Sequence, residues 1–410
     1  MITFREVKEN GTIKSYIPAD EKVPAKIKKR IVDDFDTSYY PTKPVMPFIE
    51  TVHDRIMLEV YRGCIRGCRF CQAGMVYRPV RDRTVPTLCC QAKELYENTG
   101  YDEISLTSLS ISDYSDIDEL TNTLVEWSDA NMVSLSLPSL RVDSFTKELL
   151  DKVSSVRTSG LTFAPEAGTQ RLRDAINKNV YEEDLMRAVR VAFEAGKNSV
   201  KLYFMIGLPT ETDEDIIGIA KLAKAVIDEY YKTTNRNKKR PPQVTISVAC
   251  FVPKPFTPFQ WEAQNTREEL ARKQQLLGDN ITDSRIRYTF HDSRTSHIEA
   301  VFARGDRRLS AAILEAYRRG SCFDAWDEHF DYDRWLSVFA DTGIDVAFYA
   351  NRELGEDEVL PWDIIDCGVK KEFLLRERRR AYESKPSPNC REGCLGCGAN
   401  SLGGMRRCCP

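Results

Sequence analysis

The chain has 410 residues, a formal net charge of −3 and 30% charged residues. This length is enough for a large core and two or three domains. The small net charge excludes a global basic field for nucleic-acid binding, although it leaves room for a local basic patch. No apolar run is long enough for a transmembrane helix, and the N-terminus lacks the apolar stretch of a signal peptide. We therefore expect a cytoplasmic protein without membrane contact.

The cysteines are numerous and clustered. In the reducing cytoplasm, thirteen cysteines predict metal ligands or buried thiols instead of disulfides. Three of them fall within eight residues near the first fifth of the chain, and five fall within the last 21 residues. Such clustering favours bound metal.

The N-terminal residues 1–50 predict a short hairpin followed by a linker. Residues 3–5 and 13–16 have strand character, and Asn10-Gly11 between them is a strong hairpin-turn signal. The stretch that follows, up to Pro47, is rich in proline and aspartate. It contains too little apolar material for an independent domain.

Residues 51–280 alternate short apolar runs with helical periods, which predicts parallel β/α units with right-handed crossovers. Periodicity does not choose between an open doubly wound sheet and a barrel. In both, ligands gather at the carboxyl ends of the strands. The expected strands are 57–61, 103–106, 132–137, 160–164, 200–205 and 244–251, and the expected helices are 87–98, 117–130, 145–153, those after Thr169 and Tyr181, and 212–231.

The last part of the chain divides in two. Residues 281–385 predict one strand at 285–290 and then a mostly helical extension. Residues 386–410 form a tail rich in proline, glycine and cysteine, which can hardly order itself without a metal or a partner.

A C-x3-C-x2-C loop follows the first expected strand directly, and its cysteines are Cys64, Cys68 and Cys71. Three thiolates can hold three corners of a four-iron cluster and leave one iron open to a small molecule. Zinc would need a fourth ligand, and the nearest histidine, His53, lies eleven residues before the loop. Glycines in the loop let the backbone close on a bulky ligand, and Phe70 could pack over a bound planar group.

This loop, in its place after strand one of a β/α array, resembles the radical S-adenosylmethionine (SAM) superfamily. The resemblance implies a partial six-stranded (β/α)6 barrel with a [4Fe–4S] cluster on Cys64, Cys68 and Cys71 and with SAM on the open iron. It also implies reductive cleavage of SAM to a 5′-deoxyadenosyl radical that takes hydrogen from a substrate, and a one-electron donor such as flavodoxin or ferredoxin as partner. We assign no catalytic side chain beyond the cluster ligands.

Later stretches extend the resemblance to the branch of methylthiotransferases and cobalamin-dependent radical enzymes. By position, Glu166 is similar to the acidic residue that binds the cofactor ribose, although it could instead cap the following helix. Ser108 stands where the family often has Gly-Gly-Glu near the methionine amine, so this contact departs from the pattern. The resemblance also implies four residues that line the adenine side of the SAM site or lie near it: Met205, Gly207, Phe251 and Val252. The stretches that carry the resemblance are 164–168, 207–211, 251–261 and 299–308.

Cobalamin-dependent relatives usually carry an N-terminal doubly wound domain, and only about 50 residues precede the first barrel strand here. We therefore do not expect this chain alone to bind cobalamin, and a separate or missing cobalamin-binding domain is the alternative. The substrate cannot be deduced from the sequence, and RNA is one candidate. Two rival functions stay open: methylthio or methyl transfer to RNA, tRNA or a small molecule, and a non-catalytic iron–sulfur or zinc RNA-binding protein.

The tail repeats the C-x3-C-x2-C spacing, but not after a barrel strand. Closely spaced cysteines suit a tetrahedral four-sulfur site, which favours zinc over an auxiliary iron–sulfur cluster or an unligated tail. The basic run 376–380 before the tail is typical of a solvated helix face, with an RNA contact as the alternative. The tail cysteines are Cys390, Cys394, Cys397, Cys408 and Cys409.

Overall fold

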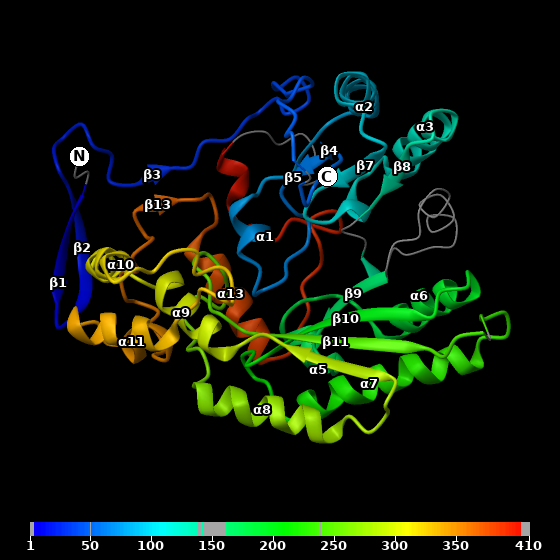
Figure 1. The fold of residues 1–410 in the computed structure, drawn as a ribbon. Coiled ribbons are helices and arrows are strands. Elements are labelled where there is room, and N and C mark those ends of the chain that lie inside the picture. The colour runs from blue at the N-terminus through cyan, green and yellow to red at the C-terminus, as the bar shows by residue number, and fades with distance from the viewer. Residues whose placement is uncertain (1–3, 50, 138–140, 143–160, 238, 403–410) are drawn as a thin grey trace.

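The computed structural model describes residues 4–49, 51–137, 141–142, 161–237 and 239–402. Its centre consists of two parallel sheets covered by helices, and a helical extension lies beside them (Figure 1).

The first sheet contains three parallel strands in the order β4-β7-β8. Ile56 and Leu58 lie two positions apart on the same face of β4, and both are buried. This face of the strand therefore contributes to the core. Two helices pack against this sheet through residues at helical spacing, such as Leu88, Ala92 and Leu95. The elements are β4 (Ile56–Glu59), α2 (Val85–Thr99), β7 (Glu103–Thr107), α3 (Ile117–Ala130) and β8 (Ser134–Ser136).

The second sheet contains four parallel strands in the order β12-β11-β10-β9. Strand β10 buries every second residue, from Val200 to Ile206, which is the pattern of a strand with one face on the core. The expected apolar face of α7, from Ile216 to Tyr230, is buried in the same core. The elements are β9 (Leu161–Glu166), α5 (Gln170–Ala175), α6 (Glu182–Glu194), β10 (Ser199–Ile206), α7 (Asp213–Lys232), β11 (Gln243–Cys250), α8 (Arg267–Asn280) and β12 (Ile286–Phe290).

These strands confirm an α/β fold of the partial-barrel kind, with parallel strands joined through helices. In the described residues, β8 and β9 belong to different sheets, so the barrel wall is interrupted between these two strands. The strand expected at 285–290 forms as β12, which pairs with β11 and so adds a seventh parallel strand to the six expected in residues 51–280. The helix expected at 145–153 lies outside the described residues, and the domain boundaries stay predictions.

The N-terminal hairpin forms as expected from strands β1 (Phe4–Glu9) and β2 (Thr12–Pro18). Asn10 and Gly11 both have positive φ angles, 52° and 81°, as a tight hairpin turn requires. The hairpin packs on the distant helical extension, where Tyr16 donates a 3.0 Å hydrogen bond to the carbonyl of Pro361. The extension contains α9 (Ser293–Ala303), α10 (Leu309–Arg318), α11 (Tyr332–Asp341), α12 (Val346–Ala350) and α13 (Lys371–Tyr382).

Short elements surround the cysteine loop and connect distant parts of the chain. Helix α13 runs through the middle of the molecule between the extension and the loop (Figure 1). The remaining elements are β3 (Ile27–Lys28), which pairs with β13 (Ile365–Asp366), β5 (Tyr61–Arg62), which pairs with β6 (Arg81–Asp82), α1 (Gln72–Val76), η1 (Ile111–Asp113) and η3 (Ala399–Leu402). No helix of the described residues is long and apolar enough to cross a membrane.

Gly168, directly after β9, marks a close approach between this strand end and α7. A Cβ atom at this position would lie 2.3 Å from the carbonyl oxygen of Asp215 and 2.3 Å from the backbone nitrogen of Ile219. Backbone atoms of a helix cannot move aside, so only glycine fits here. The contact fixes the end of β9 against the second core.

We predict that Gly168→Ala destabilises the protein by at least about 2 kcal/mol, because the added methyl overpacks the contact with α7. Chemical denaturation followed by circular dichroism measures the loss. Gly278→Ala, within α8, is the matched control. Its Cβ would lie 3.9 Å from Tyr288 of β12, so alanine is expected to be neutral or to stabilise by up to about 1 kcal/mol. Equal effects of the two substitutions would contradict the close approach.

Candidate metal and cofactor site

The cysteine loop lies between β5 and α1, at the carboxyl end of the first barrel strand. Backbone N–H groups point at two of its sulfurs: Arg66 N lies 3.4 Å from Cys64 Sγ, and Gly74 N lies 3.3 Å from Cys71 Sγ. Hydrogen bonds to sulfur are typical of thiolates that hold iron–sulfur clusters. Gly63 has a φ angle of 91°, and a Cβ there would lie 2.8 Å from the carbonyl oxygen of Pro79. The loop therefore depends on glycine for its turn.

The three thiols of the loop are close enough to influence one another. Burial, with a contribution from Cys68, raises the pKa of Cys64 to about 12. Burial, again with a contribution from Cys68, also raises the pKa of Cys71. Burial therefore favours the protonated form of both thiols, and a bound metal would displace their protons.

The sulfurs of the loop do not converge on one point. The described residues contain no group of three or more His, Cys, Asp or Glu side chains placed to hold a single metal ion. A four-iron cluster does not need such a group, because each thiolate binds a different iron at a different corner. The donor set, with three thiols and N–H···S hydrogen bonds, fits a cluster better than a single ion.

Arg69, between the second and third cysteines, anchors the loop to the C-terminal extension. Its guanidinium is completely buried and lies 3.1 Å from the Glu377 carboxylate of α13, which is 2% exposed. The remaining donors bind the carbonyl oxygens of Asp174 at 3.0 Å, Ala175 at 2.8 Å and Lys385 at 2.7 Å. A buried charge is tolerated only with such complete pairing.

Two polar contacts fix the remaining backbone of the loop. Asn177 donates to the carbonyl of Gly67 at 3.1 Å and accepts from the backbone N–H of Ser387 at 2.7 Å, so it bridges the loop and the tail. Arg66 forms an ion pair with the buried Asp113, and its Nε lies 2.9 Å from Asp113 Oδ2. Burial opposes ionisation of Asp113, but Arg66 outweighs it and lowers the pKa of this carboxyl.

Glu166, at the end of β9, faces the loop. Its φ angle of 70° is uncommon for a residue with a side chain and is a form of backbone strain found at functional sites. The carboxylate lies 3.1 Å from Lys178 Nζ, and both groups are close enough to Cys71 to act on it electrostatically. The structure thus brings the expected ribose-binding residue and an unexpected lysine to the third cysteine.

Phe70, Met205 and Phe251 meet in one apolar cluster with Ala167 and Leu208. The cluster joins the cysteine loop to the ends of β9, β10 and β11. Three residues expected near the cofactor from distant parts of the sequence therefore lie together. Ala167, which follows Glu166 in the chain, belongs to the same cluster.

Gly207 lies at the turn after β10 with a φ angle of 81°. Its backbone N–H donates at 2.7 Å to Glu211, whose carboxylate also binds Lys273 Nζ at 2.8 Å. Glu211 is nearly inaccessible to solvent, and burial raises its pKa although Lys273 opposes the shift. Glu211 therefore supports the turn instead of facing a ligand.

Two expected cofactor residues lie apart from this cluster. Ser108 lines an open hollow on the first-sheet side of the loop, together with Tyr61 and Gly63. Val252 is buried against the helices of the extension. Of the tail cysteines, Cys390, Cys394 and Cys397 lie beside Cys64, whereas Cys408 and Cys409 lie outside the described residues.

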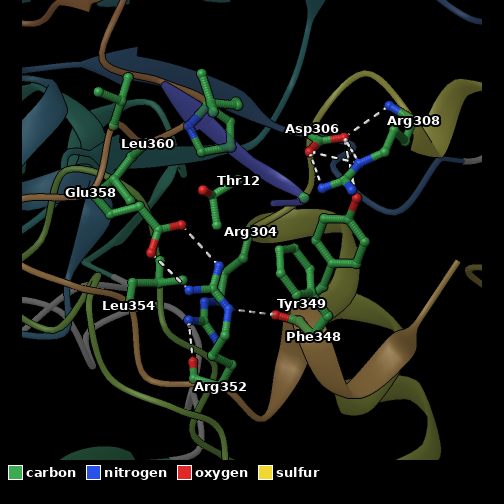
Figure 2. A pocket seen from close by; sticks show the side chains of 14 residues that line it. Thr12, Arg304, Asp306, Arg308, Phe348, Tyr349, Arg352, Leu354, Glu358 and Leu360 are labelled. Atoms are coloured by element: carbon green, nitrogen blue, oxygen red, sulfur yellow. Dashed lines mark hydrogen bonds and ion pairs between the residues drawn. The ribbon is translucent and has the colours of Figure 1, made fainter. Parts of the chain in front are cut away.

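The stretch 299–308, noted for its resemblance to relatives, lines a second pocket (Figure 2). Arg308 pairs with Asp306 at 2.6 Å, and Arg352 pairs with Glu358 at 2.7 Å. Arg304 is buried and donates to the carbonyl of Ala350 at 2.8 Å. Arg308 and Arg352 therefore each have a carboxylate partner, and Thr12 of β2 also lines the pocket, so the pocket lies where the hairpin meets the extension.

The basic run 376–380 is not uniformly a solvated face. Arg376 and Arg379 are exposed, but Glu377 is buried against Arg69. Arg378 is mostly covered and lies 2.7 Å from Glu262 Oε1. The expectation of a solvated face was wrong for Glu377 and Arg378, because their partners come from the loop and from residues after β11, which a local charge pattern does not reveal.

Several residues of the site were not expected from the sequence: Arg69, Asn177, Lys178 and Glu377. A charged residue enclosed between two cysteines was the only local signal, and it pointed to Arg69 alone. Glu377 and Asn177 lie more than a hundred positions from their partners in the loop, so only the fold brings them there.

Comparison with known proteins places the chain in a family. The sequence model of the Radical SAM superfamily matches residues 58–223. An uncharacterized protein of Methanocaldococcus jannaschii is 33% identical over 340 residues, which is 83% of this chain and 71% of that protein. The ribosomal protein uS12 methylthiotransferase RimO of Treponema denticola is 24% identical over 41% of each chain. Among solved structures, the cobalamin-bound radical SAM methyltransferase TsrM of Kitasatospora setae aligns with a TM-score of 0.37 and 16% identity over 47% of this chain and 36% of its own.

The chain belongs to the radical SAM superfamily and is an enzyme of that class. Membership implies a [4Fe–4S] cluster and SAM as cofactors. The chain spans only about two-fifths of RimO, so the match to that methylthiotransferase concerns the shared core.

We predict that Arg69→Met lowers the free energy of unfolding by about 3–5 kcal/mol, because it leaves the Glu377 carboxylate buried without its partner. Urea denaturation of the wild type and the variant measures the difference. Arg272→Met is the control, because Arg272 pairs with Asp213 at the surface and its loss is expected to cost about 1 kcal/mol or less. Similar losses for both variants would contradict a special role of the buried pair.

Proposed function

We propose that this protein is a radical SAM enzyme in which Cys64, Cys68 and Cys71 hold the catalytic [4Fe–4S] cluster. The observation that carries the proposal is the position of the cysteine loop, with Cys71 facing Glu166 and Lys178 at the carboxyl ends of parallel strands. When bound, the reduced cluster supplies one electron that cleaves SAM into methionine and a 5′-deoxyadenosyl radical, which takes a hydrogen atom from the substrate.

In the proposed binding of SAM, the residues around the loop have different roles. Glu166 offers a carboxylate that accepts hydrogen bonds from a ribose, and Lys178 holds that carboxylate in place at 3.1 Å. Phe70 and Met205, which are only partly buried, supply an apolar surface for adenine, and the buried Phe251 belongs to the cluster against which they pack. The Arg69–Glu377 pair orients the loop without facing the ligand.

The reaction requires a one-electron donor of the flavodoxin or ferredoxin class. Cobalamin binding by a separate domain stays an alternative, as does RNA as a substrate.

Replacing Cys64, Cys68 and Cys71 together by alanine is expected to abolish SAM cleavage. After anaerobic reconstitution and reduction, the wild type is expected to show a [4Fe–4S] EPR signal that changes when SAM is added, and to release 5′-deoxyadenosine. If the triple variant retains both the SAM-dependent signal and 5′-deoxyadenosine release, the proposed function is wrong. A non-catalytic iron–sulfur or zinc protein would release no 5′-deoxyadenosine even as wild type.

Glu166→Gln is expected to weaken SAM binding by about tenfold or more while leaving the iron content unchanged, because a charged acceptor of ribose hydrogen bonds is lost. Equilibrium binding of SAM to the reconstituted protein measures the change. Glu194→Gln, on the exposed face of α6, is the control and is expected to bind SAM as the wild type does. Unchanged affinity in Glu166→Gln would remove Glu166 from the cofactor site.

Methylthio or methyl transfer is the second candidate, favoured by the sequence match to a protein named a methylthiotransferase. The two reactions differ in their products. Methyl transfer from SAM leaves S-adenosylhomocysteine, whereas simple hydrogen abstraction leaves 5′-deoxyadenosine and methionine alone. Chromatography of the products with candidate RNA present distinguishes the two.

A further inference from the structure

The C-terminal tail docks directly on the catalytic cysteine loop. The backbone N–H of Cys390 donates to the carbonyl of Ile65, inside the loop, at 3.0 Å. Arg391 binds the Ser115 hydroxyl at 2.8 Å, next to η1. As a result Cys390, Cys394 and Cys397 line one cavity with Cys64. The two C-x3-C-x2-C segments are therefore neighbours in space, although more than 300 positions separate them.

Arg78 occupies the space between the two cysteine groups and is 3% exposed. Its guanidinium donates to the carbonyls of Gly74 at 3.0 Å and Arg66 at 2.8 Å and hydrogen-bonds Cys397, with Cys390 and Cys64 also in electrostatic range. Within the described part of the chain, no carboxylate forms a hydrogen bond or ion pair with it. The ring of Phe373 lies 5.6 Å from it.

A buried guanidinium needs negative charge nearby, because burial without compensation costs several kcal/mol. Carbonyl groups and an aromatic ring carry no net charge. Cysteines supply negative charge when they are thiolates, and a coordinating metal removes the thiol proton. The surroundings of Arg78 are thus balanced when the cysteines on both sides of it hold metal.

The tail shares the cysteine spacing of the loop and one kind of contact to sulfur. Gly396 N lies 3.4 Å from Sγ of Cys394, the second cysteine of the tail segment, and Arg66 N lies 3.4 Å from Sγ of Cys64, the first cysteine of the loop. Tetrahedral zinc would draw its sulfurs to one point at about 2.3 Å from the ion. Among the described residues, no three cysteines converge in this way, in either segment. The spread arrangement fits thiolates that bind different irons.

We propose that Cys390, Cys394 and Cys397 hold a second iron–sulfur cluster, packed against the catalytic loop with Arg78 between the two. This assignment goes beyond the proposed function, which needs only the first cluster. It favours iron–sulfur over zinc, the metal that cysteine spacing alone favours. Three described ligands, one cavity and a buried cation support it.

The test is metal analysis of the full chain, purified and reconstituted without oxygen. The wild type is expected to contain about eight irons, as for two four-iron clusters, and no stoichiometric zinc. The Cys390→Ala/Cys394→Ala/Cys397→Ala variant and the Cys64→Ala/Cys68→Ala/Cys71→Ala variant are each expected to keep about half of the iron. The matched control replaces Cys89, Cys90 and Cys322, which lie outside both segments, and is expected to keep all of it.

The outcomes separate this proposal from the proposed function. Stoichiometric zinc that disappears with the tail cysteines, or full iron retention without them, overturns the second cluster. Loss of all iron in the Cys64/Cys68/Cys71 variant overturns it too. Retention of a SAM-sensitive EPR signal in that same variant contradicts only the proposed function.

The single variant Cys394→Ser keeps the proposal testable if the triple variant of the tail does not fold. Cys394 is exposed, so its replacement costs little folding energy. It is expected to change the EPR or Mössbauer signal of the second cluster while the SAM-sensitive signal persists. Spectra identical to those of the wild type would overturn the assignment.

Discussion

The buried ion pair between Arg69 and Glu377 is the constraint on which the site depends. It joins residues 308 positions apart and places a full charge at the middle of the cysteine loop, inside the protein. Burying that charge is tolerated only because α13, α5 and the start of the tail together satisfy its donors. The C-terminal extension is therefore part of the active site's framework and not an accessory to the barrel.

Local patterns predicted the elements of the fold well. Asn10-Gly11 predicted the hairpin turn because positive φ angles at both positions restrict the choice of residues. Alternation in β10 and helical spacing in α7 predicted their buried faces. Each of these signals arises within a few residues, where the sequence and the physical constraint coincide.

Contacts between distant residues were not predictable in the same way. Nothing around Glu377 distinguishes it from a solvated glutamate in a basic helix, and Lys178 has no local signature of its role beside Glu166. Phe70, Met205 and Phe251 were expected near the cofactor through resemblance, but their meeting in one cluster is a property of the fold. The position of the tail against the loop was not predictable either. The spacing of cysteines indicates which of them bind one metal site, but not which other segment lies beside that site.

The docking of the tail on the loop has a consequence for the order of events during synthesis. The loop is made early, and the residues that support it, Glu377, Ser387 and Cys390, are made about 300 positions later. Contacts of such long range close late in folding, after the intervening sheets have formed. The cysteine loop therefore has its complete support only once the chain has been made as far as Cys390, so the final geometry of an early segment is set by a late one.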